Sequence, residues 1–268
     1  MPSFSRALAI VVAVVCLASC EEYTYLAPTA DEIVVQAVLD VDAREQTILV
    51  DHTLGTLSGE RPVTGAIVTI TGPDGRVLTA RESADSALYT KPPWDSIMVP
   101  VGYRINLDEY GVILSAGETY RLRVVTPAGD TVTGSTIIPV TSRLASLPRT
   151  VDTVRAGASF RVGWEPALSA RTFELHITTT APSYTTFLDS AITLSARQAA
   201  PVIDLSVAAL FSGYLNTVNV LAVDRNYYDY YRRNGQGLIA AAPISHLTGG
   251  VGLFGSIGRV SRHALQVR

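Results

Sequence analysis

The chain has 268 residues, of which 47% are hydrophobic and 17% charged, and its formal net charge at pH 7 is -3. This length leaves room for about two domains, and the absence of a lysine or arginine cluster argues against nucleic acid as a partner. The two cysteines, Cys16 and Cys20, both lie near the N-terminus. A disulfide in the mature protein is therefore excluded if Cys16 is removed with an export signal.

The first 19 residues are typical of such a signal. Arg6 gives a positive start, and the apolar run from Ala7 to Val15 is too short to span a bilayer. Residues 17–20, Leu-Ala-Ser-Cys, resemble the bacterial lipobox. The resemblance implies that residues 1–19 are removed and that Cys20 carries fatty acyl chains such as palmitate. The alternative is that Cys20 is an ordinary small residue near another cleavage site.

Residues 20–31 are then the acylated cysteine and a spacer. Several acyl chains hold a protein stably at a membrane, where one chain alone would be marginal. In the lipoproteins that this segment resembles, the inner-membrane retention signal favours aspartate after the cysteine, so Glu21 implies release to the outer membrane. Glu21 and Glu22 together also resemble surface-export signals of some Gram-negative lipoproteins. The expected location is thus the outer membrane, on its periplasmic face or at the cell surface.

Residues 32–140 alternate between apolar and polar positions and predict a first β-sandwich. The alternation is clearest in 33–39, 66–70 and 120–124, and turn signals stand at 72–75 and 127–130. Glu82 to Asp108 is expected to be loop or sheet edge, because it contains several prolines. The stretch 63–75 and the strand entry at 117–120 resemble prealbumin-like or carboxypeptidase-regulatory-like modules.

Residues 141–153 are the expected linker, and 154–268 the second β-sandwich. Phe160, Val162 and Trp164 alternate on one strand, and 173–177 alternates on the next, which resembles a fibronectin type III or immunoglobulin-like domain. The expected fold is all-β, with two antiparallel β-sandwiches (immunoglobulin-like or prealbumin-like) in tandem and a short helix near the C-terminus.

That helix is predicted after Asp224, which is a suitable N-cap. Tyr227, Tyr230 and Tyr231 then share one face at helical spacing. One interpretation is that the tyrosines pack the helix onto the second sandwich. The other is that they form an aromatic platform for a sugar, to which Trp94 in the proline-rich segment would add.

Gly250, Gly252 and Gly255 have the G-x-G-x-x-G spacing of a dinucleotide-binding loop, but neither a βαβ unit nor a following helix accompanies them. A glycine-rich segment that passes close to another strand, with Phe254 as an apolar plug, is the better interpretation.

The runs 223–231 and 249–255 are similar to the C-terminal signature of an uncharacterised lipoprotein family, domain of unknown function 4249. The strand 65–70 and the Ser-Thr-x-Ile-Pro segment 135–139 also match that family. The resemblance implies a lipid-anchored pair of β domains, with genes beside TonB-dependent receptors. It implies no reaction and no catalytic residue.

Catalytic residues are not grouped in the sequence either. The four histidines, His52, His176, His246 and His263, show no zinc-ligand spacing. A hydrolytic set of Ser245 and His246 with Asp224 or Asp229 would not converge on an extended strand. The acid pairs 40/42 and 108/109 are expected to be solvated loop acids. The chain is therefore expected not to be an enzyme, and no metal or cofactor is expected.

The leading functional hypothesis is a non-enzymatic binding or accessory protein, held at the outer membrane by its lipid and partnered with a TonB-dependent receptor or transporter. The loops 82–108 and 227–237 would meet the partner. A glycan-binding module at the cell surface is the alternative, and an envelope hydrolase is a third hypothesis.

Overall fold

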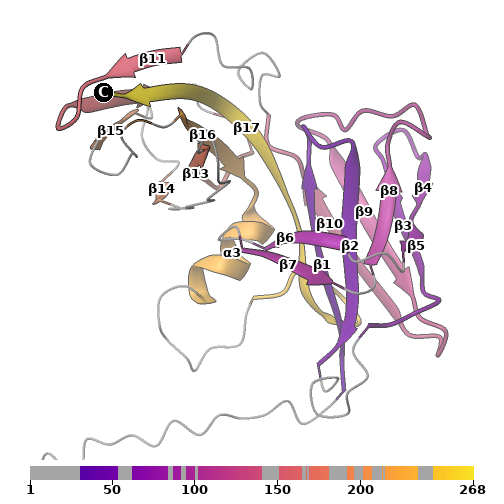
Figure 1. The fold of residues 1–268 in the computed structure, drawn as a ribbon. Helices are drawn as coiled ribbons and strands as arrows, with labels where there is room; N and C mark the ends of the chain where they lie inside the picture. The colour runs from indigo at the N-terminus through magenta and orange to yellow at the C-terminus, as the bar shows by residue number, and fades with distance from the viewer. Residues whose placement is uncertain are drawn as a thin grey trace, which may run out of the picture.

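The computed structural model describes residues 31–53, 62–83, 87–91, 95–99, 102–140, 151–164, 167, 169–180, 192–195, 202–206, 213, 215–234 and 244–268. Its strands form two β-rich units, and the C-terminal strand runs through both of them (Figure 1). Within these ranges, no helix has the length and apolar character needed to cross a bilayer.

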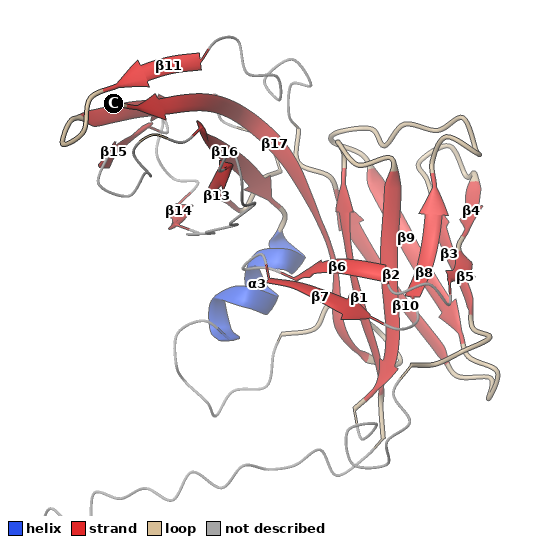
Figure 2. Ribbon diagram, in the orientation of Figure 1, coloured by secondary structure: helices blue, strands red, loops and turns tan. Residues whose placement is uncertain are grey.

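The first unit is a sandwich of two layers (Figure 2). One layer contains, in order, β1 (Ile33–Asp40), β2 (Glu45–His52), β8 (Gly102–Asn106) and β5 (Arg81–Ser83). The other contains, in order, β10 (Thr131–Ile137), β9 (Thr119–Val125), β3 (Ile67–Thr71) and β4 (Val77–Thr79). The predicted alternation is confirmed, because side chains such as Val35, Ile48 and Leu122 form one core between the layers.

The chain crosses between the two layers at both open sides of this sandwich. On one side β4 ends at Thr79 and β5 begins at Arg81, so the backbone passes from one layer to the other through Ala80 alone. On the opposite side Thr248 pairs with Thr133 of β10 through two hydrogen bonds of 2.9 Å before the chain enters the last strand. β4 and β5 are edge strands of three residues each, and such short edges limit pairing with other chains.

The expectation of loop or edge structure between Glu82 and Asp108 is wrong for its last part. β8 lies inside the layer, between β2 and β5, and its side chains Tyr103 and Ile105 are buried. β6 (Ala87–Lys91) and β7 (Asp95–Val99) pair with each other as a separate hairpin. The prolines at 92, 93 and 100 stand outside the bounds of these strands in the sequence, and they lie outside the described residues.

The second unit contains the remaining strands. They are β11 (Val151–Val154), β12 (Ser159–Gly163), β13 (Thr172–Thr180), β14 (Ile192–Ser195), β15 (Val202–Ser206) and β16 (Leu215–Val223). β12 pairs with β15, and β13 lies between β14 and β16. Trp164 directly follows β12 and is partly buried, rather than fully buried on the strand as expected, and its ring lies 5.6 Å from that of Phe173. The fold is therefore all-β and sandwich-like, as predicted.

The last strand, β17 (Val251–Val267), joins the two units. Its first half, Val251 to Ile257, runs parallel to β1, whereas its second half is antiparallel to β16 and parallel to β11. The pairing of β16 with β17 shifts register between Val220 and Leu221, at the point where β17 leaves one unit for the other. Phe254 belongs to the core of the first sandwich and Leu265 to that of the second.

The two expected domains therefore share a strand. Residues 251–257, which the sequence analysis assigned to the second sandwich, pair with the first, and β11 begins inside the expected linker 141–153. The sheets are also mixed, because β17 makes two parallel pairings. The pairing with β1 brings together segments more than 200 residues apart, and neither parallel pairing leaves a signal in local alternation.

The glycines of this strand lie where another backbone comes close. Gly252 has a φ of +120°, and a Cβ at this position would collide with the carbonyl oxygen of Val35 on β1. A Cβ on Gly250 would lie 2.6 Å from the carbonyl oxygen of Ile33. The interpretation as a close backbone approach is confirmed, and so is that of Phe254 as a buried plug.

Candidate functional site

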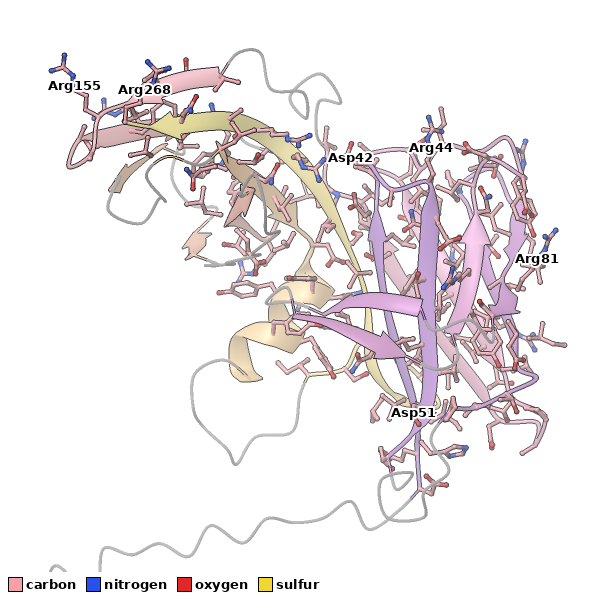
Figure 3. All side chains as sticks on the ribbon, in the orientation of Figure 1. Asp42, Arg44, Asp51, Arg81, Arg155 and Arg268 are labelled. Carbon is pink, nitrogen blue, oxygen red and sulfur yellow. The ribbon has the colours of Figure 1, made fainter. Side chains whose placement is uncertain are left out.

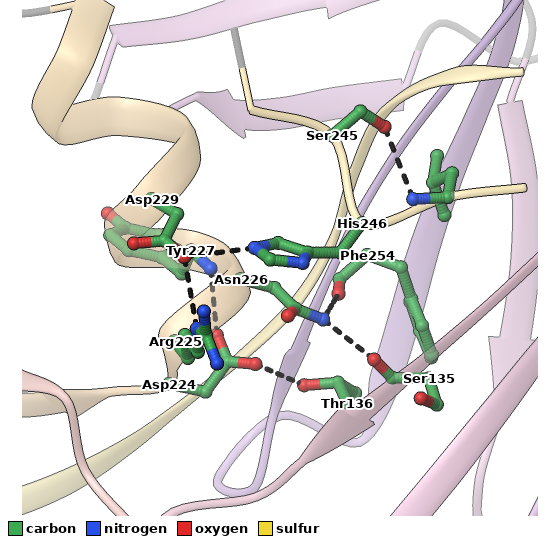
Figure 4. A network of polar contacts seen from close by, with 11 residues as sticks. Ser135, Thr136, Asp224, Arg225, Asn226, Tyr227, Asp229, Ser245, His246 and Phe254 are labelled. Carbon is green, nitrogen blue, oxygen red and sulfur yellow. Dashed lines mark hydrogen bonds and ion pairs between the residues drawn. The ribbon is translucent and has the colours of Figure 1, made fainter.

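The polar residues of the C-terminal third gather where helix α3 (Arg225–Asn234) meets the first sandwich (Figure 4). The helix starts after Asp224, whose Oδ1 accepts a hydrogen bond of 2.9 Å from the backbone N–H of Tyr227. This is the predicted N-cap, in which a side-chain oxygen satisfies an amide that the first helical turn leaves unpaired.

The second carboxylate oxygen of Asp224 connects the helix to two strands. It lies 2.6 Å from Thr136 Oγ1 on β10, and that hydroxyl lies 2.9 Å from Ser256 Oγ on β17. Ser256 Oγ in turn lies 2.9 Å from the carbonyl oxygen of Ile137. All three side chains are buried, and the segments that they join are far apart in the sequence.

The protons of this network can be counted. Three oxygen-to-oxygen contacts need three hydrogens, but the hydroxyls of Thr136 and Ser256 supply two. Thr136 Oγ1 lies within reach of both Asp224 Oδ2 and Ser256 Oγ and has one hydrogen to donate, so a proton on Asp224 would be needed to satisfy all three contacts at once. Burial raises the pKa of Asp224, although hydrogen bonds donated by Thr136 and the backbone amides act in the opposite direction. Burial is the largest of these effects, and it favours the neutral carboxyl.

Asn226 attaches the same helix to both strands. Its Nδ2 donates to the carbonyl oxygens of Ser135 on β10, at 2.7 Å, and Phe254 on β17, at 2.8 Å. One amide group has two N–H donors, and both are used here. The helix start is thus fixed to the first sandwich through two side chains, Asp224 and Asn226.

The tyrosines of α3 face the inside of this junction. Tyr227 is fully buried, its hydroxyl lies 3.1 Å from Glu174 Oε2, and its ring lies 4.8 Å from that of Tyr231. Tyr230 and Tyr231 are partly buried, and they pack beside Tyr227 on a cluster drawn from β1, β16 and β17. The packing interpretation fits this geometry, with the helix placed between the two units rather than on the second alone.

Tyr227 has no exposed ring face, so it is wrong as a candidate for stacking against a sugar. Trp94, the other aromatic residue of that hypothesis, lies outside the described residues, as does Cys20. Tyr230 and Tyr231 stay untested as ligand-binding residues.

The residues of the hydrolase hypothesis do not assemble into a triad. His246 Nε2 lies 3.0 Å from Asp229 Oδ2, but the hydroxyl of Ser245 accepts a hydrogen bond of 3.3 Å from the backbone N–H of Leu247. In Figure 4 the side chain of Ser245 points away from the imidazole of His246. Asp229 also forms a salt bridge of 3.2 Å with Arg225. Asp229 and His246 are thus paired as an acid and a base, but Ser245 is not placed beside them as a nucleophile.

The other ionisable candidates have structural partners. His52 lies 3.0 Å from Asp31, and His263 packs edge-on against Phe160, where burial lowers its pKa. The side chain of His176 lies outside the described residues. Among the residues that the structure describes, no group of three or more histidine, cysteine, aspartate or glutamate side chains is arranged to hold a metal ion.

The expectation of solvated acids at 40 and 42 is wrong. Asp42 forms a salt bridge of 3.1 Å with Arg259 of β17, and both side chains are largely buried. Burial raises the pKa of Asp40, although Arg259 and the backbone N–H of Asp42 act against it. Both acids therefore belong to the contact between β17 and the first sandwich. Asp108 and Glu109 are more exposed and pair with Arg44 and Arg81.

A family model described as "Domain of unknown function (DUF4249)" matches residues 21–262. The chain belongs to this family. The segments by which it resembles DUF4249 proteins meet in space, because 135–139 contains Thr136, 223–231 contains Asp224 and Asn226, and 249–255 contains Phe254. In this DUF4249 chain the signature marks the junction between the two units.

A search of curated proteins finds no match to this DUF4249 chain. Three solved structures similar to it are the FN1-FN3 domains of chicken CNTN1, a tetra-tandem repeat from the extending region of a large adhesion protein, and the N-terminal eight Ig domains of DSCAM isoform 1.30.30. Their identities are 9%, 13% and 14%, and their TM-scores 0.21, 0.21 and 0.20. The matches cover 88%, 86% and 90% of this chain, and 67%, 49% and 26% of those chains. At these TM-scores the likeness carries no argument.

Thr136, Ser256 and Asn226 are the members of the network that the sequence analysis did not single out. Thr136 lies inside the Ser-Thr-x-Ile-Pro segment, and Asn226 directly follows the predicted cap, so the family signature was a signal for both. No pattern in the sequence indicated that Ser256 would join a polar network, because serine is common in glycine-rich segments.

Proposed function

We propose that this DUF4249 protein is a non-enzymatic binding or accessory protein, anchored at the outer membrane by acyl chains on Cys20 and partnered with a TonB-dependent receptor. The observation that carries the anchor is the Leu-Ala-Ser-Cys sequence at 17–20, directly behind a short apolar run. A lipid on Cys20 and the spacer to residue 31 would place the β units beside the membrane.

A non-enzymatic role is supported by the structural partners of the side chains that were considered as catalytic candidates. Asp224 caps a helix and joins strands, Tyr227 packs a core, and Asp42 holds β17 through Arg259. Ser245 and His246 have separate partners. The glycan alternative gains no support from the described residues, because its most central tyrosine is buried.

The anchor is tested by metabolic labelling with palmitate. The wild-type chain is expected to incorporate label, and Cys20→Ser is expected to incorporate none, because its hydroxyl does not replace the thiol as the lipidated group. Cys16→Ser is the matched control, since it removes the chain's other cysteine, and it should label like the wild type. Equal labelling of Cys20→Ser and wild type would show that the anchor assignment is wrong.

The partnership is tested by cross-linking in intact cells, followed by purification of the anchored protein from solubilised envelopes. A TonB-dependent receptor is expected to co-purify with the wild-type protein and to be depleted with Cys20→Ser, which is no longer held beside it. Recovery of the anchored protein without a receptor, under conditions that preserve known envelope complexes, would contradict the partnership and leave the anchor unaffected.

A further inference from the structure

The outer face of the four-stranded layer carries positive but no negative side chains. Alternate residues of its strands point away from the core and line this face, which we call the arginine face. It carries two arginines among threonine, serine and aliphatic side chains, without an aspartate or glutamate: Thr119, Arg121, Arg123, Val125, Thr131, Thr133, Ser135, Ile137, Ile67, Thr69, Thr71, Val77 and Thr79. The face is positive on a chain whose net charge is negative.

The register of the strands places hydroxyl groups on both sides of each arginine. Arg123 is paired across the sheet with Thr133 on β10 and Thr69 on β3. Arg121 is paired in the same way with Ser135 and Thr71. The two arginines are therefore neighbours on one side of β9, about 7 Å apart along the strand, with hydrogen-bonding groups around them.

Three aliphatic side chains on the same face are well exposed. Ile67 is 58% exposed, Val77 51% and Ile137 45%. They come from three different strands and surround the pair of arginines. Arginine is enriched in protein interfaces, and lysine, glutamate and aspartate are depleted there, so two arginines without an acid on this face suit contact with another protein.

The other arginines described in the first sandwich have carboxylate partners. The salt bridges are Arg44 with Asp108, Arg76 with Asp74, Arg81 with Glu109, and Arg104 with Glu45. Within the described part of the chain, neither Arg121 nor Arg123 has an ion pair. Two unpaired like charges at this spacing repel one another, and an external anion would remove that repulsion.

We propose that the arginine face docks an extended acidic segment of a partner protein, with carboxylates at alternate positions bound by Arg121 and Arg123. Side chains on one face of an extended segment repeat about every 7 Å, which matches the spacing of Arg121 and Arg123 along β9. A guanidinium binds a carboxylate through two parallel N–H donors, and the hydroxyls of Thr133 and Ser135 on the neighbouring strand could supply further donors, whereas Thr69 donates to the carbonyl oxygen of Arg123. The proposal deepens the proposed function, since it rests on the protein being a binding protein and names the chemistry of its partner.

The test uses the full chain in detergent and two synthetic peptides of the same composition. In one peptide glutamate and threonine alternate, and in the other the glutamates form one block. Calorimetric titration is expected to show tighter binding of the alternating peptide. The double variant Arg121→Thr and Arg123→Thr, which extends the threonine pattern of the face, is expected to lower that affinity about tenfold or more. Added salt should weaken the wild-type complex.

The double variant Arg155→Thr and Arg268→Thr is the matched control. Both residues are exposed and belong to the second unit, far from the first sandwich (Figure 3), so their removal changes the net charge by the same two units without touching the arginine face. Equal binding of the two peptides, unchanged affinity in the variant of the arginine face, or an equal loss in the control variant would each overturn the proposal. The proposal would also be overturned if the protein bound heparin, a sulfated polysaccharide, but neither of the acidic peptides. These outcomes leave receptor co-purification unaffected, so a failure here is distinct from a failure of the proposed function.

Discussion

Replacement of Gly252 by alanine is expected to lower the free energy of unfolding by about 4 kcal/mol or more. The residue has a φ of +120°, and an added Cβ would collide with the carbonyl oxygen of Val35. The colliding atom belongs to the backbone of β1, which is held between β2 and β17 and has no room to move. Urea unfolding followed by circular dichroism measures the change.

Gly129→Ala separates the two causes of this loss. Gly129 also has a positive φ, of +96°, but a Cβ there would meet no atom within 4 Å. It should therefore cost only the conformational strain, about 1–2 kcal/mol. The difference between the two variants measures the contact between β17 and β1. Equal losses in both would contradict the close approach of these strands.

The second prediction concerns the buried carboxyl of Asp224, which should make the protein less stable as the pH rises. Its folded pKa is raised above the ordinary value of 3.8, chiefly by burial. Below pH 3.8 both the folded and the unfolded state hold the proton. Between 3.8 and the folded pKa, the unfolded state releases the proton first, so the free energy of unfolding falls. Each pKa unit between the two states corresponds to about 1.4 kcal/mol.

Asp224→Asn isolates this contribution from those of other acids, including Asp40, whose pKa burial also raises. The amide retains an oxygen for the N–H of Tyr227 and supplies a donor for Thr136, so it reproduces the neutral carboxyl. Compared by urea unfolding across pH, the variant should match the wild type in acid and exceed it above the folded pKa. A variant that is much less stable than the wild type at neutral pH would show that Asp224 is ionised in the fold.

Alternation along the chain predicted most strands of the first sandwich, because a strand with one buried face has apolar residues at every second position of its sequence. Alternation also located β12, β13 and β16 in the second unit, although the described side chains of β13 at 172–175 are all buried, as are those at the end of β16. It failed between residues 82 and 108, where the prolines were given more weight than the alternation of Tyr103, Ile105 and Leu107. In the sequence, the prolines at 92, 93 and 100 stand between the bounds of β6, β7 and β8 and not within them.

The junction was harder to predict than the strands. The N-cap at Asp224 and the shared face of the tyrosines follow from helical geometry, which is local. The contact of Asp224 with Thr136 depends on a strand 88 residues earlier, and that with Ser256 on the parallel pairing of β17. The same long-range pairing buries Asp42 against Arg259. The spacing of residues within one segment of the sequence does not predict contacts between segments that are far apart in the chain.

The shared strand also sets the order in which the molecule can be completed. Residues 251–257 emerge from the ribosome, and from any export channel, after all other strands of the first sandwich. Until they arrive, β1 has hydrogen-bonding groups free along one side, which is the condition under which a β protein joins the wrong neighbour. A chaperone that covers the free edge of β1 during export would therefore matter more to this protein than to one whose domains fold independently, one after another.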